Sequence, residues 1–142
     1  MASEPIGKYL SIARRAHATL LDEKLKPYNI SHGQILLLIT LFREEGINQC
    51  QLCRIYNLDK AGVNRSIKKL KENGFITKKA DPEDRRRKML FLTGKARNFR
   101  PTLLKILDGV EEQIRQGLSE EEIETYLRVM KKICRNLDVN HI

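Results

Sequence analysis

Apolar residues recur every three or four positions along most of this chain, which is the period of an amphipathic helix. The first such stretch runs from Ile6 to Leu25. A second, more fully apolar stretch follows Ser31, a favourable N-terminal helix cap, and is expected to end at Gly46. Two more, over residues 93–114 and 119–137, predict long helices near the C-terminus. Pro101 should kink or divide the first of these.

The middle of the chain predicts shorter elements. A short helix over residues 48–56 is followed, after a tight turn, by a helix that begins after Asp59 and stops at Gly74. Beyond Gly74 the runs FITKK and KMLFLT flank the charged loop ADPEDRRR, which predicts a two-stranded hairpin with a charged tip. The order helix, helix, tight turn, helix, hairpin is that of a winged helix-turn-helix. The fold class is therefore mainly α, with a two-stranded wing.

Positive charge is concentrated in one part of the chain. Residues 60–100 hold 14 of the 27 lysines and arginines but only four of the 18 acidic residues, a net charge of +10 within a chain of net charge +9. A charge excess confined to one segment is typical of a surface that contacts phosphates. We therefore expect a polyanionic partner, and function should be sought in this segment.

The helix after Asp59 buries Val63, Ile67 and Leu70 and leaves a basic outer face. Its outward residues near the N-terminal end can reach base edges in the major groove of DNA, which is about 12 Å wide. These candidates are Lys60, Ala61, Gly62, Asn64, Arg65 and Lys68. Arginine suits guanine and asparagine suits adenine, while Ala61 and Gly62 would let the backbone approach closely. A second basic element beside this helix favours duplex DNA over a merely solvated surface.

A different class of function is a winged-helix module that binds another protein. Such a module would usually present an apolar patch on the outer face of this helix, and this helix presents lysines and an arginine instead. The chain is not predicted to be an enzyme, because its three histidines are scattered and no nucleophile–base arrangement or phosphate-binding glycine loop is visible. No cofactor or metal is predicted. The absence of a long apolar run argues against a membrane segment and favours a cytoplasmic protein.

Residues 58–75, LDKAGVNRSIKKLKENGF, and residues 81–96, DPEDRRRKMLFLTGKA, resemble the recognition helix and wing of the MarR (multiple antibiotic resistance) regulators. The Asp-x-Arg signature of that wing falls on Asp84 and Arg86, with Arg85 and Arg87 beside them. The resemblance implies that Arg86 enters the minor groove while Asp84 orients a wing arginine. Gly62 and Asn64 stand where Thr or Ser is frequent in the family, so its base preference cannot be transferred.

The chain has apolar helices at both ends, and the winged lobe of residues 31–94 cannot bury both stripes alone. The resemblance implies a single MarR-type domain in which residues 1–30 and 95–142 are dimerisation arms that interlock around a two-fold axis. Two recognition helices would then lie about 34 Å apart on a pseudo-palindromic operator, where the homodimer would act as a ligand-responsive repressor. The alternative is that the arms pack only against their own lobe.

Members of the resembling family often respond to small aromatic carboxylates such as salicylate, bound between arms and lobe. Arg15 and His32 occupy positions used by some relatives, Tyr28 is a weaker candidate, and Arg86 could reach such a ligand when DNA is absent. For Arg15 the alternative is an interface salt bridge, and for His32 it is an exposed residue of the first helical turn without a ligand.

Cys50 and Cys53 form a Cys-x-x-Cys motif, whose spacing also occurs in redox and zinc sites. A zinc site needs two more ligands, and neither a second cysteine pair nor a nearby His pair is present. The favoured interpretation is structural, with Cys53 a small buried hydrophobe facing the second helix and Cys50 half exposed. A redox- or metal-sensing variant of the regulator that uses Cys50 and Cys53 is the alternative.

Overall fold

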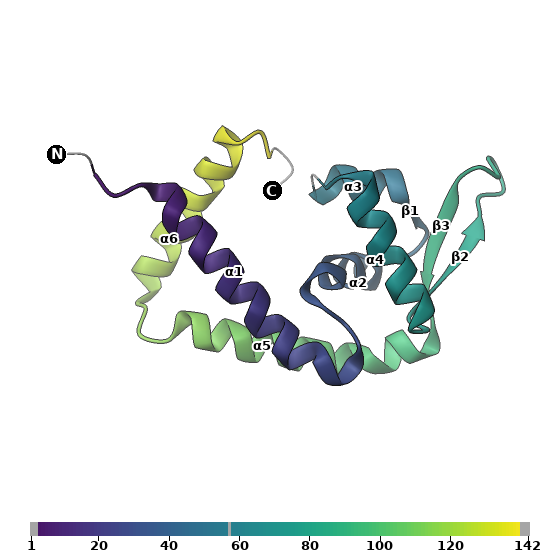
Figure 1. Cartoon of the computed structure of the whole chain (residues 1–142), viewed down its shortest axis with the longest axis horizontal. Coiled ribbons are helices and arrows are strands. Elements are labelled where there is room, and N and C mark those ends of the chain that lie inside the picture. The colour runs from purple at the N-terminus through teal and green to yellow at the C-terminus, as the bar shows by residue number, and fades with distance from the viewer. Residues whose placement is uncertain (1–2, 57, 140–142) are drawn as a thin grey trace.

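The computed structural model describes residues 3–56 and 58–139, and it places the predicted helices in the predicted order (Figure 1). The helices are α1 (Ile6–Leu25), the 3-10 helix η1 (Lys26–Tyr28), α2 (His32–Arg43), α3 (Gln49–Tyr56), α4 (Lys60–Glu72), α5 (Gly94–Arg115) and α6 (Glu120–Asn136). The strands are β1 (Ile47–Asn48), β2 (Ile76–Ala80) and β3 (Lys88–Leu92). The predicted tight turn between α3 and α4 includes Asn57, which lies outside the described residues.

The predicted caps are largely present. The backbone N–H of Ser31 donates to Gln34 Oε1 at the start of α2 (2.7 Å), and Asp59 Oδ1 accepts from the N–H of Gly62 at the start of α4 (3.0 Å). Ser119 and Glu122 form the predicted capping box of α6. Pro101 lies within one continuous helix, α5, and does not divide it.

Two predictions were incomplete around the end of α2. The helix ends at Arg43 rather than at Gly46, because the chain turns extended at Glu44 and the N–H of Gly46 donates to the carbonyl of Leu90 (2.8 Å). The two residues of β1 that follow pair with β3, so the sheet has three antiparallel strands in the order β1-β3-β2. The predicted hairpin, β2 and β3, is the wing.

The core lies where the C-terminal end of α1, the helices α2, α3 and α4, the sheet and the first half of α5 meet. Val63, Ile67 and Leu70 of α4 are buried as predicted. On α3, Leu52 is buried but Ile55 is 36% exposed, so the two do not share a buried face. Other fully buried side chains fill the space between these elements: Leu25, Leu38, Leu41, Phe75, Ile76, Leu90 and Leu103.

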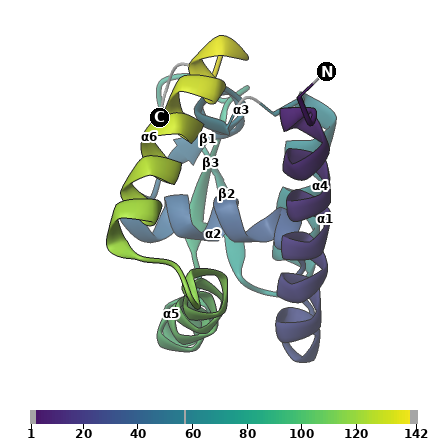
Figure 2. The same cartoon turned by 90° about the vertical axis from the view of Figure 1, so that its left-hand side faces the viewer.

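The helices α1, α5 and α6, which we call the arms, extend away from the winged lobe. Figure 1 shows α1 and α5 running out from the lobe, and Figure 2 shows α1 and α6 on opposite sides, with α5 seen end-on at the foot of α6. No α6 residue is buried in the single chain. Within the described residues, no helix is long and apolar enough to cross a lipid bilayer.

Candidate nucleic-acid interface

Helix α4 presents its cations to solvent because its aliphatic residues point into the core. Lys60, Ala61, Asn64, Arg65 and Lys68 are all exposed, as predicted for residues that read a major groove. They lie near the N-terminal half of the helix, where backbone N–H groups also favour anions.

Gly62 differs from the other candidates of α4. It is half buried, and a Cβ atom at this position would lie 2.6 Å from Asp59 Oδ1, the oxygen that caps the helix. A side chain here would therefore displace the capping carboxylate. The glycine protects the cap of α4, a role that its spacing in the sequence did not suggest.

The tip of the wing is ordered by Asp84. Its Oδ1 accepts from the backbone N–H of Arg86 (3.1 Å) and from Arg86 Nε (3.2 Å), and Arg87 Nε lies 3.8 Å from Oδ2. These hydrogen bonds lower the pKa of the Asp84 carboxyl below its ordinary value of 3.8, the backbone bond contributing most. The Arg86 side chain is 93% exposed, whereas Asp84 is 30% exposed. Asp84 thus holds the guanidinium of Arg86 at its inner nitrogen while the terminal nitrogens face solvent.

The base of the wing is fixed by a residue that sequence analysis missed. Glu45 Oε1 accepts from the backbone N–H of Leu92 at the end of β3 (2.7 Å) and from Arg97 of α5 (3.0 Å). Thr93 adds a second link, since its hydroxyl donates to the carbonyl of Gly74 (2.6 Å) and accepts from the N–H of Ala96. No local pattern could reveal the pairing with Glu45, because its partners lie 47 and 52 positions further along the chain.

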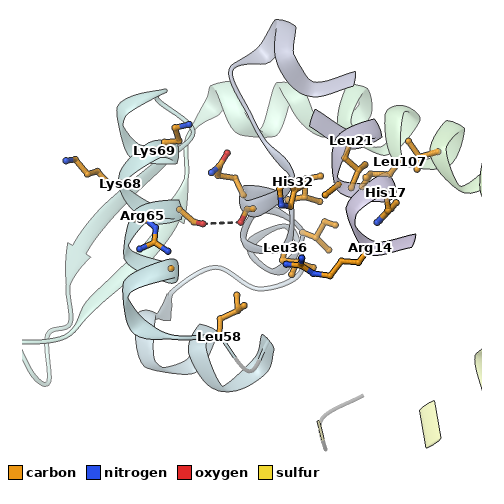
Figure 3. A pocket seen from close by; sticks show the side chains of 18 of the residues that line it. Arg14, His17, Leu21, His32, Leu36, Leu58, Arg65, Lys68, Lys69 and Leu107 are labelled. Atoms are coloured by element: carbon orange, nitrogen blue, oxygen red, sulfur yellow. Dashed lines mark hydrogen bonds between the residues drawn. The ribbon is translucent and has the colours of Figure 1, made fainter. Parts of the chain in front are cut away.

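A groove of about 1120 Å³ separates the lobe from the arms (Figure 3). Its walls are largely apolar, with Leu21, Leu36, Leu58 and Leu107 among the lining residues. Cationic side chains surround the apolar part: Arg14 from α1, and Arg65, Lys68 and Lys69 from α4. The carboxylates of Asp59, Glu72 and Glu111 also line the groove, so its charged lining is mixed, and it extends to two candidate DNA-contacting residues, Arg65 and Lys68.

His32 lines this groove and is held by Asp22 of α1. The ring Nδ1 lies 2.9 and 3.1 Å from the two carboxylate oxygens, and the backbone N–H of His32 donates to Oδ1 (2.7 Å). Burial raises the pKa of Asp22, but the hydrogen bonds from His32 outweigh it and the net shift is downward. Asp22 therefore stays ionised and ties α1 to the start of α2.

The other effector candidates lie outside this groove. Arg14, not Arg15, is among the residues that line it. Tyr28 packs against Phe99 with ring centroids 4.9 Å apart, and it is not among the lining residues either. Arg15 was a candidate because of the resemblance to the MarR family and not because of the helical period of α1.

Both cysteines of the Cys-x-x-Cys motif are free thiols on α3. Cys53 is only half buried against the core, and Cys50 is exposed rather than half exposed. In the described part of the chain, no group of three or more His, Cys, Asp or Glu side chains is placed to hold a metal ion.

Comparison with known proteins places this arrangement among transcriptional regulators. The MarR family model matches residues 30–88, which include the helix-turn-helix and most of the wing. The HTH-type transcriptional regulator YybA of Bacillus subtilis (strain 168) is 28% identical over 133 residues, 94% of this chain and 89% of that protein.

Solved structures of similar proteins match nearly the whole length of this chain. A MarR transcriptional regulator from Methanosarcina mazei Go1 is 32% identical, with a TM-score of 0.84 over 95% of this chain and 99% of that one. A MarR family regulator from Listeria monocytogenes, crystallised with a 26-mer DNA, is 27% identical, with a TM-score of 0.86 over 95% of this chain and 90% of that one. The similarity therefore includes the arms as well as the winged lobe.

The Asp84 contact predicts a measurable titration. The carboxyl should titrate below 3.8, and Arg86→Ala should raise this pKa only part of the way, because the N–H of residue 86 still donates. Since the pKa is lowered in the folded wing, the contact is complete at neutral pH and is lost as the pH falls through that lowered value. Carboxyl carbon shifts followed by NMR give the measurement. A wild-type value at or above 3.8 would contradict the contact.

Proposed function

This chain belongs to the MarR family of transcriptional regulators, and on that basis we propose that it binds duplex DNA as a homodimer and represses transcription. Helix α4 enters the major groove, and the wing places Arg86 in the neighbouring minor groove. Arg85 and Arg87 contact the phosphates beside it. Occupation of a pseudo-palindromic operator then blocks access to the promoter.

The observation that carries this proposal is the pairing of two exposed basic elements on one rigid lobe. The cations of α4 project from a helix whose aliphatic face is buried, and Arg86 projects from a turn ordered by Asp84. Neutralisation of phosphates by such cations releases counterions and supplies most of the non-specific affinity for DNA. The DNA complex of the Listeria regulator supports the same assignment for this chain.

A protein-binding module is less consistent with α4. Among the described residues, the exposed large apolar side chains lie on α1, α2, α3, α5, α6 and the connections between helices, and none lies on α4. Apolar and aromatic anchors carry most of the affinity in protein–protein interfaces. The outer face of α4 therefore fits a polyanion better than a protein surface.

Arg86→Ala should weaken binding to a specific duplex by about 1–3 kcal/mol and make the affinity less dependent on salt, because the change removes both a groove contact and a cation. Fluorescence anisotropy across a salt series gives both quantities. Lys105→Ala, which removes an exposed lysine of α5 outside the lobe, is the matched control and should leave affinity nearly unchanged. Equal affinity of wild type and Arg86→Ala for the selected operator would show that the wing does not bind as proposed.

The homodimer is proposed because the arms expose apolar surface that soluble monomers rarely leave in water. Tyr126 and Leu127 of α6 are 60% and 44% exposed, and Ile6, Tyr9 and Ile12 of α1 are also exposed. In a dimer with a two-fold axis, the apolar faces of α1 and α6 in one chain can be covered by the same faces of the other chain.

Leu127→Glu should dissociate the dimer, because the new carboxylate would be buried without a partner. Thr125→Glu introduces the same charge on the opposite side of α6 and should leave the dimer intact. Sedimentation velocity at micromolar concentration separates the two results. A monomeric wild type, or a Leu127→Glu variant as dimeric as Thr125→Glu, would contradict the proposed interface.

We propose that the groove between lobe and arms binds a small aromatic acid, with Arg14 rather than Arg15 at its anionic group and His32 beside it. The bound acid must favour a spacing of the recognition helices different from the DNA-bound one. A ligand that binds both conformations with equal affinity does not shift the equilibrium between them. The acid would then release the operator.

Salicylate should therefore lower operator affinity, and by linkage the operator should lower salicylate affinity by the same factor. Calorimetric titrations with and without operator measure this coupling. Arg14→Ala should reduce the coupling, whereas Arg15→Ala, its neighbour outside the groove, should preserve it. The proposed site is wrong if salicylate binds equally tightly with and without operator, or if Arg14→Ala and Arg15→Ala change the coupling by the same factor.

A further inference from the structure

Asn73, at the C-terminal end of α4, makes hydrogen bonds both to the segment that follows α1 and to α5. Its side-chain Nδ2 donates to the carbonyl of Asn29 (2.7 Å), which follows α1 and η1. Its own backbone carbonyl accepts from Lys95 Nζ (2.6 Å), which belongs to the first turn of α5. The two partners lie 44 residues before and 22 residues after Asn73 in the chain. One residue therefore connects the recognition helix to the helices on either side of it.

The two hydrogen-bond partners of Asn73, Asn29 and Lys95, are themselves restrained by other contacts. Asn29 adopts a left-handed conformation with φ of 58°, and its backbone N–H donates to the carbonyl of Lys26. The Lys95 ammonium lies 4.7 Å from the centre of the Phe75 ring, and that ring is buried in the core. The backbone of Asn29 and the ammonium of Lys95 are thus restrained by contacts other than those they make with Asn73.

Apolar packing alone would leave some freedom to α4. The burial of Val63, Ile67 and Leu70 holds the helix against the lobe, but hydrophobic contact is non-directional and permits small rotations and shifts. Hydrogen bonds weaken steeply when their geometry changes, so they restrain orientation more sharply than apolar contacts do. The Asn73 contacts restrain the end of α4 that lies nearest to the arms, and Figure 1 shows this end beside the start of α5.

We propose that Asn73 and Lys95 are positioning residues that set the separation of the two recognition helices, and thereby the half-site spacing that the dimer accepts. This inference rests on the proposed homodimer and on its binding to DNA through α4. In such a dimer the arms form the interface, so the orientation of α4 relative to the arms fixes the distance between the two α4 helices. Neither residue needs to touch a base for this effect.

Operators of altered spacing test the proposal with the full chain. The preferred duplex is first selected from random-sequence DNA, and one base pair is then inserted or removed at its centre. Each change moves one half-site by about 3.4 Å and about a tenth of a turn. The readout is the ratio of affinities for the preferred and altered duplexes, because a general loss of stability or charge changes both affinities alike and leaves the ratio unchanged.

Asn73→Ala and Lys95→Ala should each lower this ratio by about two- to tenfold, the factor expected from the loss of one hydrogen bond. Lys71→Ala removes an exposed lysine from the last turn of α4 and should weaken binding to all three duplexes equally. Thermal unfolding checks that each variant is folded. If Asn73→Ala does not fold, Lys95→Ala decides, because it changes an exposed side chain outside α4.

A ratio that is unchanged in both variants would overturn the proposal, and so would a wild-type protein that binds all three spacings equally well. A wild-type protein that selects no duplex from the random pool would contradict the proposed function instead. The two failures are therefore distinguishable in one experiment.

Discussion

The position of α4 in the DNA-binding lobe depends first on the burial of its apolar face. Truncation of a buried aliphatic residue such as Leu70 to alanine typically costs about 2–5 kcal/mol, whereas an exposed ion pair contributes about 0–1 kcal/mol. The apolar face therefore decides where the helix lies, and the cations on the other face do not. Because the lysines and arginine of α4 are not needed to hold the fold, they remain available to phosphates and bases.

The direction of the wing is set by polar contacts between the hairpin and the rest of the lobe. A hairpin of two five-residue strands is at best marginally stable alone, so its direction must come from elsewhere. Strand β1 pairs with one edge of β3, and Glu45, just before the start of β1, accepts from the Leu92 N–H and pairs with Arg97 of α5. The base of the wing is thus fixed to the arms, and Asp84 orders its tip. The two parts proposed to contact DNA are held differently. Helix α4 is held by apolar packing along its length and by the hydrogen bonds of Asn73 at its end, and the wing is held by directed polar contacts at its base and tip.

The sequence was sufficient for features that depend on local patterns. The helical period and the caps at Ser31, Asp59 and Ser119 predicted the order of the elements. The resemblance of the Asp-x-Arg wing signature implied that Asp84 holds a wing arginine, and in the structure that arginine is Arg86. The sequence was insufficient where the outcome depends on distant partners. Strand β1 has two residues and no period of its own, and the bonds of Glu45 and Asn73 join residues 22 to 52 positions apart. On α1, the resemblance to the MarR family pointed to Arg15, and Arg14, about 100° away around the helix, is the arginine that lines the groove.

The central claim is that two lobes of one dimer read two half-sites, each with α4 in the major groove and a wing in the flanking minor groove. Hydroxyl-radical footprinting of the selected operator tests it most directly, because the radical abstracts hydrogen from the backbone sugars and so shows which stretches of each strand the protein covers. The account predicts two protected regions related by a two-fold axis, with centres one helical turn of DNA apart and an outer minor-groove protection at each side. A single protected half-site, or protection without the outer minor-groove component, would contradict it.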